Sequence, residues 1–202
     1  MRIAILGTGH MATTLGTALV KAGHDVTFGS RTPQSAAALP APVLDHAAAI
    51  SGSDVVISAL AAAHSLTTLT ALSEPLSGRI LIDIGNAVDE RFNLIYQDSS
   101  LGERLQLALP DTKVVKTLNT VGGPIGVQPS LLSAPSNVFL SADHDDAKAV
   151  VSSLLSELGW AADAQIDLGG IATAKAAEHY FLLFAALMGS LRSPAFNIAI
   201  VR

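Results

Sequence analysis

The sequence predicts a single α/β domain in which helices cover both faces of a doubly wound, mostly parallel sheet. Short β-branched runs alternate with alanine-rich stretches of helical period. One run, Val55-Val56-Ile57, lacks polar alternation, which is typical of a strand buried on both faces. The 202 residues suffice for one large core, and no internal repeat or low-complexity linker divides them.

The elements follow in order along the chain. Strands are expected at residues 2–6, 25–28, 42–44, 54–60, 79–84, 113–117, 137–141 and 163–168. Helices are expected at residues 11–22, 33–39, 64–72, 101–109, 145–158 and 170–188, with a further helix after Asp45 and a turn of helix at 130–132. Gly23 and Gly159 stand where glycine ends a helix, and Asp45 is a candidate N-cap.

Two segments are expected to be loops, residues 86–100 and 119–135. A loop as long as the second, inside a compact domain, is more often functional than idle. Residues 1–202 are thus predicted to form one domain, with 170–202 as its C-terminal helical extension.

The composition first suggests a membrane protein, because 50% of the residues are hydrophobic and only 14% are charged. Much of the apolar count is alanine, however, and the longest apolar run, 181–188, is far shorter than the ~20 residues of a spanning helix. Met1-Arg2 leads directly into an apolar strand instead of a signal peptide. We therefore expect a cytoplasmic protein that does not contact a membrane.

Several kinds of chemistry are excluded or disfavoured. The absence of cysteine excludes disulfides and thiolate chemistry. A net charge of −5 without a basic run disfavours nucleic acid as a partner. No spacing of His, Asp and Glu suggests a metal site.

The segment Gly7-Thr8-Gly9-His10-Met11-Ala12 has the pattern G-x-G-x-x-A between the first strand and the first helix. Gly7 would allow a tight turn, Gly9 a close approach to a pyrophosphate, and Ala12 close packing of helix on strand. The helix N-terminus then offers free N–H groups to the anion. The pattern predicts a Rossmann NAD(P)-binding fold with His10 beside the pyrophosphate. The alternatives are a turn without ligand and a merely tolerated histidine.

The second strand ends in Ser30-Arg31-Thr32, without the carboxylate that holds the ribose 2′-hydroxyl of NAD. The guanidinium of Arg31 and the hydroxyls of Ser30 and Thr32 suit a 2′-phosphate. We therefore predict that NADP(H) is preferred over NAD(H). The alternative is a solvated loop arginine.

With these two motifs, three later segments complete a resemblance that runs in order over essentially the whole chain. They are Asp83-Ile84-Gly85-Asn86, Lys116-Thr117-Leu118-Asn119-Thr120 and Phe196-Asn197-Ile198. The sequence resembles the family of NADP oxidoreductases that depend on coenzyme F420. The same domain occurs as the NADPH module of the six-transmembrane epithelial antigen metalloreductases.

The resemblance implies that NADP(H) is bound through residues 8–11 and 30–31. It also implies a nicotinamide site near Ala59, Leu60, Ala61, Gly85 and Asn86, and His64 matches a histidine of several such proteins. A second redox partner, coenzyme F420 or FMN or FAD, would stack on the nicotinamide beneath the loop 119–124. The alanines at 61–63 and the small residues at 121–124 depart from the family pattern at this place.

Asn119 and Thr120 are further candidates for cofactor binding, because ligands bind outside the carboxyl ends of strands in open α/β sheets. Alternatively, their side chains tie the loop to its own backbone. Hydride transfer between two rings depends on positioning more than on acid–base groups, so we assign no catalytic residue. Two other functions stay open, reduction of a small imine or keto acid and a non-catalytic NADPH-binding sensor or subunit.

The last predicted helix carries two groups of residues. Lys175, Glu178 and His179 share one face, which predicts a solvated ion pair or, alternatively, a lysine at the redox site. Apolar residues cover much of the remaining surface and predict core packing together with the seam of a homodimer. These are Phe181, Leu182, Phe184, Ala185 and Met188.

Overall fold

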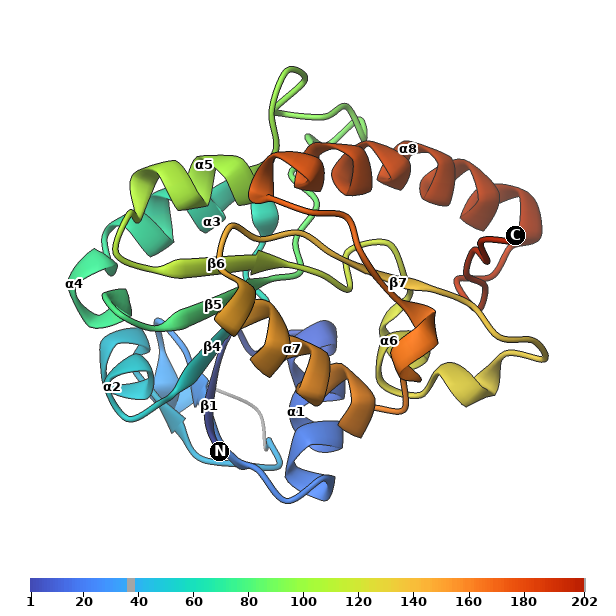
Figure 1. The fold of residues 1–202 in the computed structure, drawn as a ribbon. Coiled ribbons are helices and arrows are strands. Elements are labelled where there is room, and N and C mark those ends of the chain that lie inside the picture. The colour runs from blue at the N-terminus through green and yellow to red at the C-terminus, as the bar shows by residue number, and fades with distance from the viewer. Residues whose placement is uncertain (36–38, 202) are drawn as a thin grey trace.

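The computed structural model of the chain describes residues 1–35 and 39–201. Its centre is a parallel six-stranded sheet in the order β3-β2-β1-β4-β5-β6 (Figure 1). The strands are β1 (Arg2–Leu6), β2 (Asp25–Gly29), β3 (Val43–Leu44), β4 (Val55–Ser58), β5 (Ile80–Asp83) and β6 (Lys113–Lys116). This is the strand order of the Rossmann fold, which confirms the predicted class.

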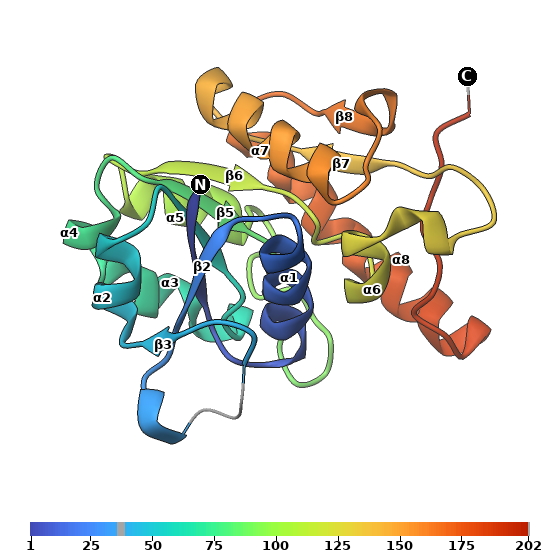
Figure 2. The same cartoon turned by 90° about the horizontal axis from the view of Figure 1, so that it is seen from below.

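Helices cover both faces of the sheet (Figure 2). On one face lie α1 (His10–Lys21) and α7 (Asp145–Glu157), and the short α6 (Gly123–Val127) packs beside α1. On the other lie α2 (His46–Ser51), α3 (Ala62–Thr70), α4 (Ser73–Leu76) and α5 (Leu101–Ala108). The long C-terminal helix α8 (Ala174–Leu191) packs on α5.

Two cores result from the alternation of side chains along the strands. In β1, Ile3 and Ile5 join the core under α1 and α7, whereas Ala4 and Leu6 join the core on the opposite face. The helix α1 approaches β2 closely because Gly16 faces the ring of Phe28. A Cβ at Gly16 would lie only 2.3 Å from Phe28 Cζ.

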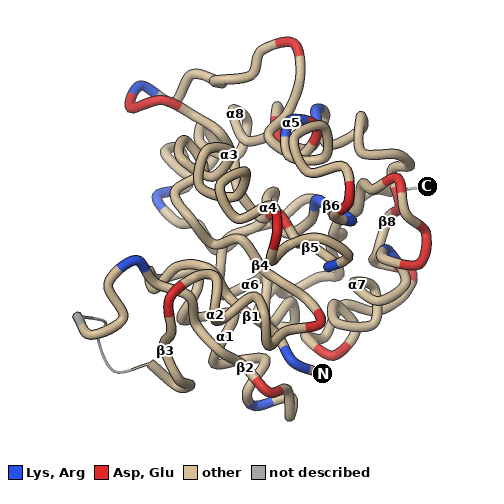
Figure 3. Tube along the Cα trace, turned by 90° about the vertical axis from the view of Figure 1, so that its left-hand side faces the viewer, with Lys and Arg blue, Asp and Glu red and all other residues tan. Residues whose placement is uncertain are grey.

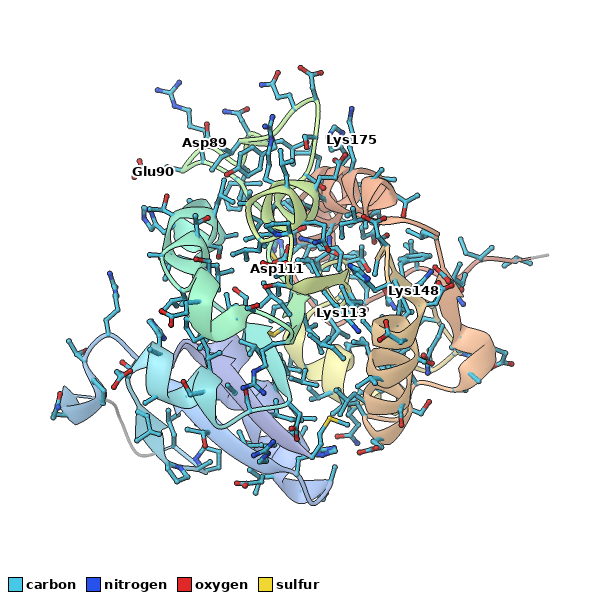
Figure 4. All side chains as sticks on the ribbon, turned by 60° about the vertical axis from the view of Figure 1, so that its left-hand side comes forward. Asp89, Glu90, Asp111, Lys113, Lys148 and Lys175 are labelled. Carbon is cyan, nitrogen blue, oxygen red and sulfur yellow. The ribbon has the colours of Figure 1, made fainter. Side chains whose placement is uncertain are left out.

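The last two strands do not extend the main sheet. β7 (Val138–Leu140) and β8 (Gln165–Asp167) pair with each other in a separate two-stranded sheet. A single antiparallel bridge between Lys116 and Ser141 links the region of β7 to β6. Lys148 of α7, labelled in Figure 4, pairs with Asp167 of β8 at 2.8 Å and holds the helix against this small sheet.

Three short helical segments differ from the prediction and a fourth agrees with it. The segment 119–135, expected to be mostly loop, contains α6, whereas its 3₁₀ turn at Pro129–Leu131 agrees with the turn of helix expected at 130–132. Only a 3₁₀ turn at Pro33–Ser35 occurs where a helix was expected over 33–39, and residues 36–38 of that expectation lie outside the described residues. The helix α4 was missed. Helices this short have too few turns to show a periodic pattern.

The helix α8 is only partly covered by the rest of the domain. Phe184 is buried, Phe181, Ala185 and Met188 are half-buried, and Leu182 is exposed. By length and hydropathy alone, Ile171–Leu191 is one helix of the described chain that is apolar enough to cross a membrane, with 28% of its most apolar window buried. Charged residues elsewhere are scattered along the trace rather than gathered on one element (Figure 3).

Candidate functional site at the carboxyl edge of the sheet

The carboxyl ends of the central strands are aligned in one row. The pairing places Gly29 beside Leu6, Leu6 beside Ser58, Ser58 beside Asp83 and Asp83 beside Lys116. Each residue that follows these five therefore lies at the same edge of the sheet. The strand order reverses between β1 and β4, which is where open α/β sheets bind their ligands.

The glycine turn follows β1 at this reversal. Gly7 has a φ of +120°, and a Cβ there would lie 2.6 Å from the carbonyl oxygen of Ala59. Side chains are therefore excluded at Gly7, as the motif predicted. A Cβ at Gly9 would meet no atom within 4 Å, and Thr8, Gly9 and His10 are exposed. The backbone at Gly9 is thus open to a ligand.

Helix α1 begins directly after this turn. Gly9 is its N-cap and has no side chain to cap the helix, so the free N–H groups of the first turn point toward the open edge. Met11 is half-buried, while Ala12 is completely buried in the core under α1. The spacing of the motif thus gives the close helix packing expected of it and leaves the start of α1 open, while anion binding there stays a prediction.

The end of β2 presents a cation beside this turn. Arg31 and Thr32 are exposed, and Ser30 is buried with its Oγ accepting a hydrogen bond from the Thr32 backbone N–H at 3.1 Å. None of the ion pairs in the described part of the chain includes Arg31. An exposed guanidinium without a carboxylate partner fits a 2′-phosphate.

His46, the first residue of α2, lies at the end of β2 and is not among the predicted site residues. Its Nδ1 lies 2.9 Å from the position that a Cβ on Gly29 would occupy. Neither ring nitrogen has a hydrogen-bond partner among the described residues. Burial lowers the pKa of His46, and the positive charge of Arg31 lowers it further. Nothing local in the sequence signals this contact, because it joins the start of α2 to the end of β2, 17 residues earlier in the chain.

The residues after β4 form a surface of small side chains. Ala59 donates its N–H to Leu6 O at 2.9 Å, and Ala61 is the N-cap of α3. Ala61, Ala63 and His64 are exposed, whereas Ala59 and Leu60 are half-buried. The small side chains after this strand end are therefore accessible from solvent.

The loops after β5 and β6 are joined by a pair of asparagines. Asn86 Nδ2 donates to the backbone oxygen of Asn119 at 2.7 Å, and Asn119 Nδ2 donates to Asn86 Oδ1 at 2.9 Å. Asn119 Nδ2 also donates to the Ala177 carbonyl of α8 at 3.0 Å. Asn119 thus ties its loop to other elements. Gly85 and Asn86 are half-buried at this edge, while Asn119 and Thr120 are buried, and Thr120 Oγ1 has no partner in the described chain.

A buried ion cluster lies beneath these loops. Lys116 Nζ lies 2.9 Å from Asp83 Oδ2 and 2.8 Å from Glu178 Oε1. The expected solvated ion pair on α8 is therefore wrong for Glu178, which is only 2% exposed and pairs with the strand lysine. Lys175 and His179 are half-buried, and Figure 4 shows Lys175 at the end of the molecule that carries Asp89 and Glu90.

A groove of about 750 Å³ runs along the outer side of α1, between α6 and α7. Polar residues in its lining include His10, Thr13, Thr17, Lys21, Gln128 and Glu157. It shares only His10 with the residues expected to bind a cofactor. The carboxyl edge of the sheet, with its open turn and free cation, is therefore the stronger candidate site.

This sheet order, with an open glycine turn at its switch point, defines a dinucleotide-binding domain. A sequence profile of the family "NADP oxidoreductase coenzyme F420-dependent" matches residues 2–87. A candidate F420-dependent NADP reductase from Arthrobacter sp. FB24 has a solved structure similar to this chain. The two are 38% identical with a TM-score of 0.94, and the match covers 100% of both chains.

The chain belongs to this family of F420-dependent NADP oxidoreductases and is an NADP-dependent oxidoreductase. It is 26% identical to the F420-dependent NADP reductase of Methanothermobacter marburgensis, with 88% of each sequence covered. It is 31% identical to metalloreductase STEAP3 of Rattus norvegicus over 88% of this chain, but it spans only 36% of that protein.

More distant structures share the fold alone. An imine reductase from Myxococcus stipitatus in complex with NADP⁺ is 17% identical with a TM-score of 0.69, and the match covers 95% of this chain but 64% of that one.

Proposed function

We propose that the protein transfers hydride between NADP(H) and a deazaflavin or flavin acceptor. The observation that carries this proposal is the surface after β4, where the side chains of Ala61 and Ala63 are exposed and the Cβ of Ala62 between them lies 3.0 Å from the position that a Cβ on Gly85 would occupy. Such a surface leaves room for a second planar ring. Two rings held face to face need positioning rather than an acid or base.

In this proposal, different residues of the chain bind different parts of the cofactor. The turn at Gly9 and the first N–H groups of α1 hold the pyrophosphate, and Arg31 with Ser30 holds the 2′-phosphate. Asn86, fixed by Asn119, contacts the nicotinamide end. The bound cofactor supplies the hydride, which the acceptor ring takes up together with a proton from water.

Anaerobic stopped-flow spectroscopy of NADPH oxidation tests the proposal, with coenzyme F420, FMN and FAD as separate acceptors and with a cyclic imine and a keto acid as comparison substrates. We expect rapid oxidation with at least one of the three ring acceptors. Oxidation only with a cyclic imine or a keto acid would replace this proposal by the function of a small-substrate reductase. Tight NADPH binding without turnover would identify a sensor or an accessory subunit instead.

We further propose that α8 forms the seam of a cytoplasmic homodimer. Leu182 and Leu183 are 45% and 53% exposed, and Phe92 stacks on Phe181 beside them at 6.2 Å. Exposed apolar patches of this kind mark interaction surfaces. A second copy is favoured over a bilayer because Glu178, one turn earlier, is bonded to the interior of the domain.

Sedimentation velocity tests the dimer. Leu183→Glu should yield a monomer, because it places a charge in the apolar seam. Leu107→Glu on α5, where the side chain is 78% exposed, is the matched control and should not change the mass. A wild-type protein that remains monomeric at high concentration would refute the proposal.

A further inference from the structure

The ion cluster of Lys116, Asp83 and Glu178 joins three elements that are distant in sequence. Lys116 ends β6, Asp83 ends β5 and Glu178 lies in the second turn of α8. The exposed fractions are 1%, 0% and 2%. Burial alone would lower the pKa of Lys116, but the two carboxylates outweigh it and raise the pKa. The lysine is therefore charged, and the cluster carries an ion pair inside the protein.

The cluster reaches the edge of the sheet through Gly85. Asp83 Oδ1 accepts the backbone N–H of Gly85 at 3.0 Å, and Lys116 Nζ donates to the carbonyl oxygen of Gly85. The backbone N–H and the backbone carbonyl of Gly85 are thus both fixed by charged side chains. The next residue, Asn86, is the one that pairs with Asn119.

The same cluster is anchored to two helices. Glu178 Oε2 accepts from the Leu101 N–H at 2.9 Å, and Oε1 accepts from the Gly102 N–H at 3.1 Å, so that α8 caps the start of α5. One residue before Glu178, the carbonyl of Ala177 accepts from Asn119. Two consecutive residues of α8 therefore hold the Gly85–Asn86 loop from one side and the Asn119 loop from the other.

Stability alone is a poor explanation for such a cluster. Buried ion pairs cost desolvation, and replacing them with apolar residues of similar volume is often neutral or stabilising. What the apolar replacement would not supply is the directional contact to Gly85.

We propose that Lys116, Asp83 and Glu178 are positioning residues for the nicotinamide half of NADP(H). This inference rests on the proposed placement of the nicotinamide beside Gly85 and Asn86. The charges fix these two residues in one geometry, so that the loop needs no ordering when the cofactor binds. The adenosine half, bound at Gly9 and Arg31, is independent of the cluster.

Calorimetric titration with two ligands tests whether the cluster affects binding of the nicotinamide half and not of the adenosine half. NADPH carries both halves, whereas 2′,5′-ADP carries the adenosine and the 2′-phosphate without the nicotinamide. In Glu178→Gln the carboxylate becomes an amide that cannot accept both N–H groups and neutralise Lys116. We expect the affinity for NADPH to fall about tenfold, as for the loss of one or two hydrogen bonds. The affinity for 2′,5′-ADP should change less than about twofold.

The matched control is Glu103→Gln, a carboxylate in the same first turn of α5. Glu103 Oε2 accepts hydrogen bonds from the hydroxyls of Ser99 and Ser100, both at 3.1 Å. Glu103→Gln should leave the affinities for NADPH and for 2′,5′-ADP unchanged. Asp83→Asn is the milder variant, because it retains the ion pair of Lys116 and Glu178. If Glu178→Gln does not fold, the same two titrations on Asp83→Asn test the inference.

The outcomes separate this inference from the function on which it rests. Equal losses for the two ligands, no loss for either, or failure of both variants to fold would show a purely structural cluster and overturn the inference. A wild-type protein that binds neither ligand would instead refute the proposed function.

Discussion

Replacing Arg31 by alanine tests the cofactor preference most directly. Arg31 is exposed and has no ion-pair partner in the described chain, so its loss should leave the free energy of unfolding within about 0.5 kcal/mol of the wild type. A hydrogen bond to a charged group contributes about 1.5–3 kcal/mol. We therefore expect the dissociation constant of NADPH to rise about 10- to 150-fold. The dissociation constant of NADH, which lacks the phosphate, should stay the same.

Isothermal titration of both cofactors, at low and at high salt, measures this difference. The loss for NADPH should shrink at high salt, because the phosphate contact is solvent-accessible and screened. Arg91→Ala is the control, since Arg91 is also exposed but lies beyond Asn86 in the loop after β5, and not at the end of β2 where the 2′-phosphate is proposed to bind. Equal losses for NADPH and NADH would refute the assignment of Arg31 to the 2′-phosphate.

An independent measurement on the same variant needs no cofactor. The positive charge of Arg31 is one of the two causes that lower the pKa of His46, the other being burial. Removing the charge should raise the pKa of His46 part of the way to its ordinary value, as followed by NMR titration of the imidazole. An unchanged pKa would mean that Arg31 does not act on the ring of His46.

Three further variants have defined outcomes. Gly7→Ala places a Cβ 2.6 Å from Ala59 O at a φ of +120°. It should therefore lower the free energy of unfolding by more than about 1–2 kcal/mol and weaken NADPH binding. Gly52→Ala is the control and should change neither quantity, because a Cβ at Gly52 meets nothing within 4 Å. Trp160→Phe removes the 2.8 Å bond from Nε1 to Gly126 O and should cost about 1–3 kcal/mol in urea unfolding; a change near zero would contradict this. The Arg2 guanidinium holds the pKa of Asp54 at about 2. The ion pair therefore stabilises the fold above about pH 4 and loses its effect as the pH falls toward 2. Asp54→Asn should lower the free energy of unfolding slightly at neutral pH and leave it unchanged in strong acid.

The parts of the site that depend on local sequence could be predicted. A strand, a glycine turn and a helix follow one another directly between Arg2 and Lys21, and the φ of Gly7 with the open space at Gly9 are what that spacing requires. The Asp45 cap of α2 is equally local, with Asp45 Oδ1 accepting from the Ala48 N–H at 2.9 Å. Both features need only neighbouring residues to form.

The parts that depend on long-range contacts could not be predicted. Helical spacing alone placed Glu178 near Lys175, and it could not show that Lys116 on a distant strand would bury the carboxylate. Likewise, β7 and β8 have the composition of sheet strands, but strand partners are chosen in three dimensions, and these two pair apart from the main sheet. His46 was missed for the same reason.

The anchoring of α8 has a thermodynamic consequence. Ala177 and Glu178 connect this helix to the loops at the sheet edge, while Leu182 and Leu183, one turn further on, face outward. If a molecule that binds α8 shifts the helix and the loops move with it, that molecule changes the affinity for a ligand at those loops. By reciprocity, the ligand must change the affinity for that molecule by the same factor. If the outer side of α8 is where two copies meet, occupancy of the nucleotide site should depend on protein concentration.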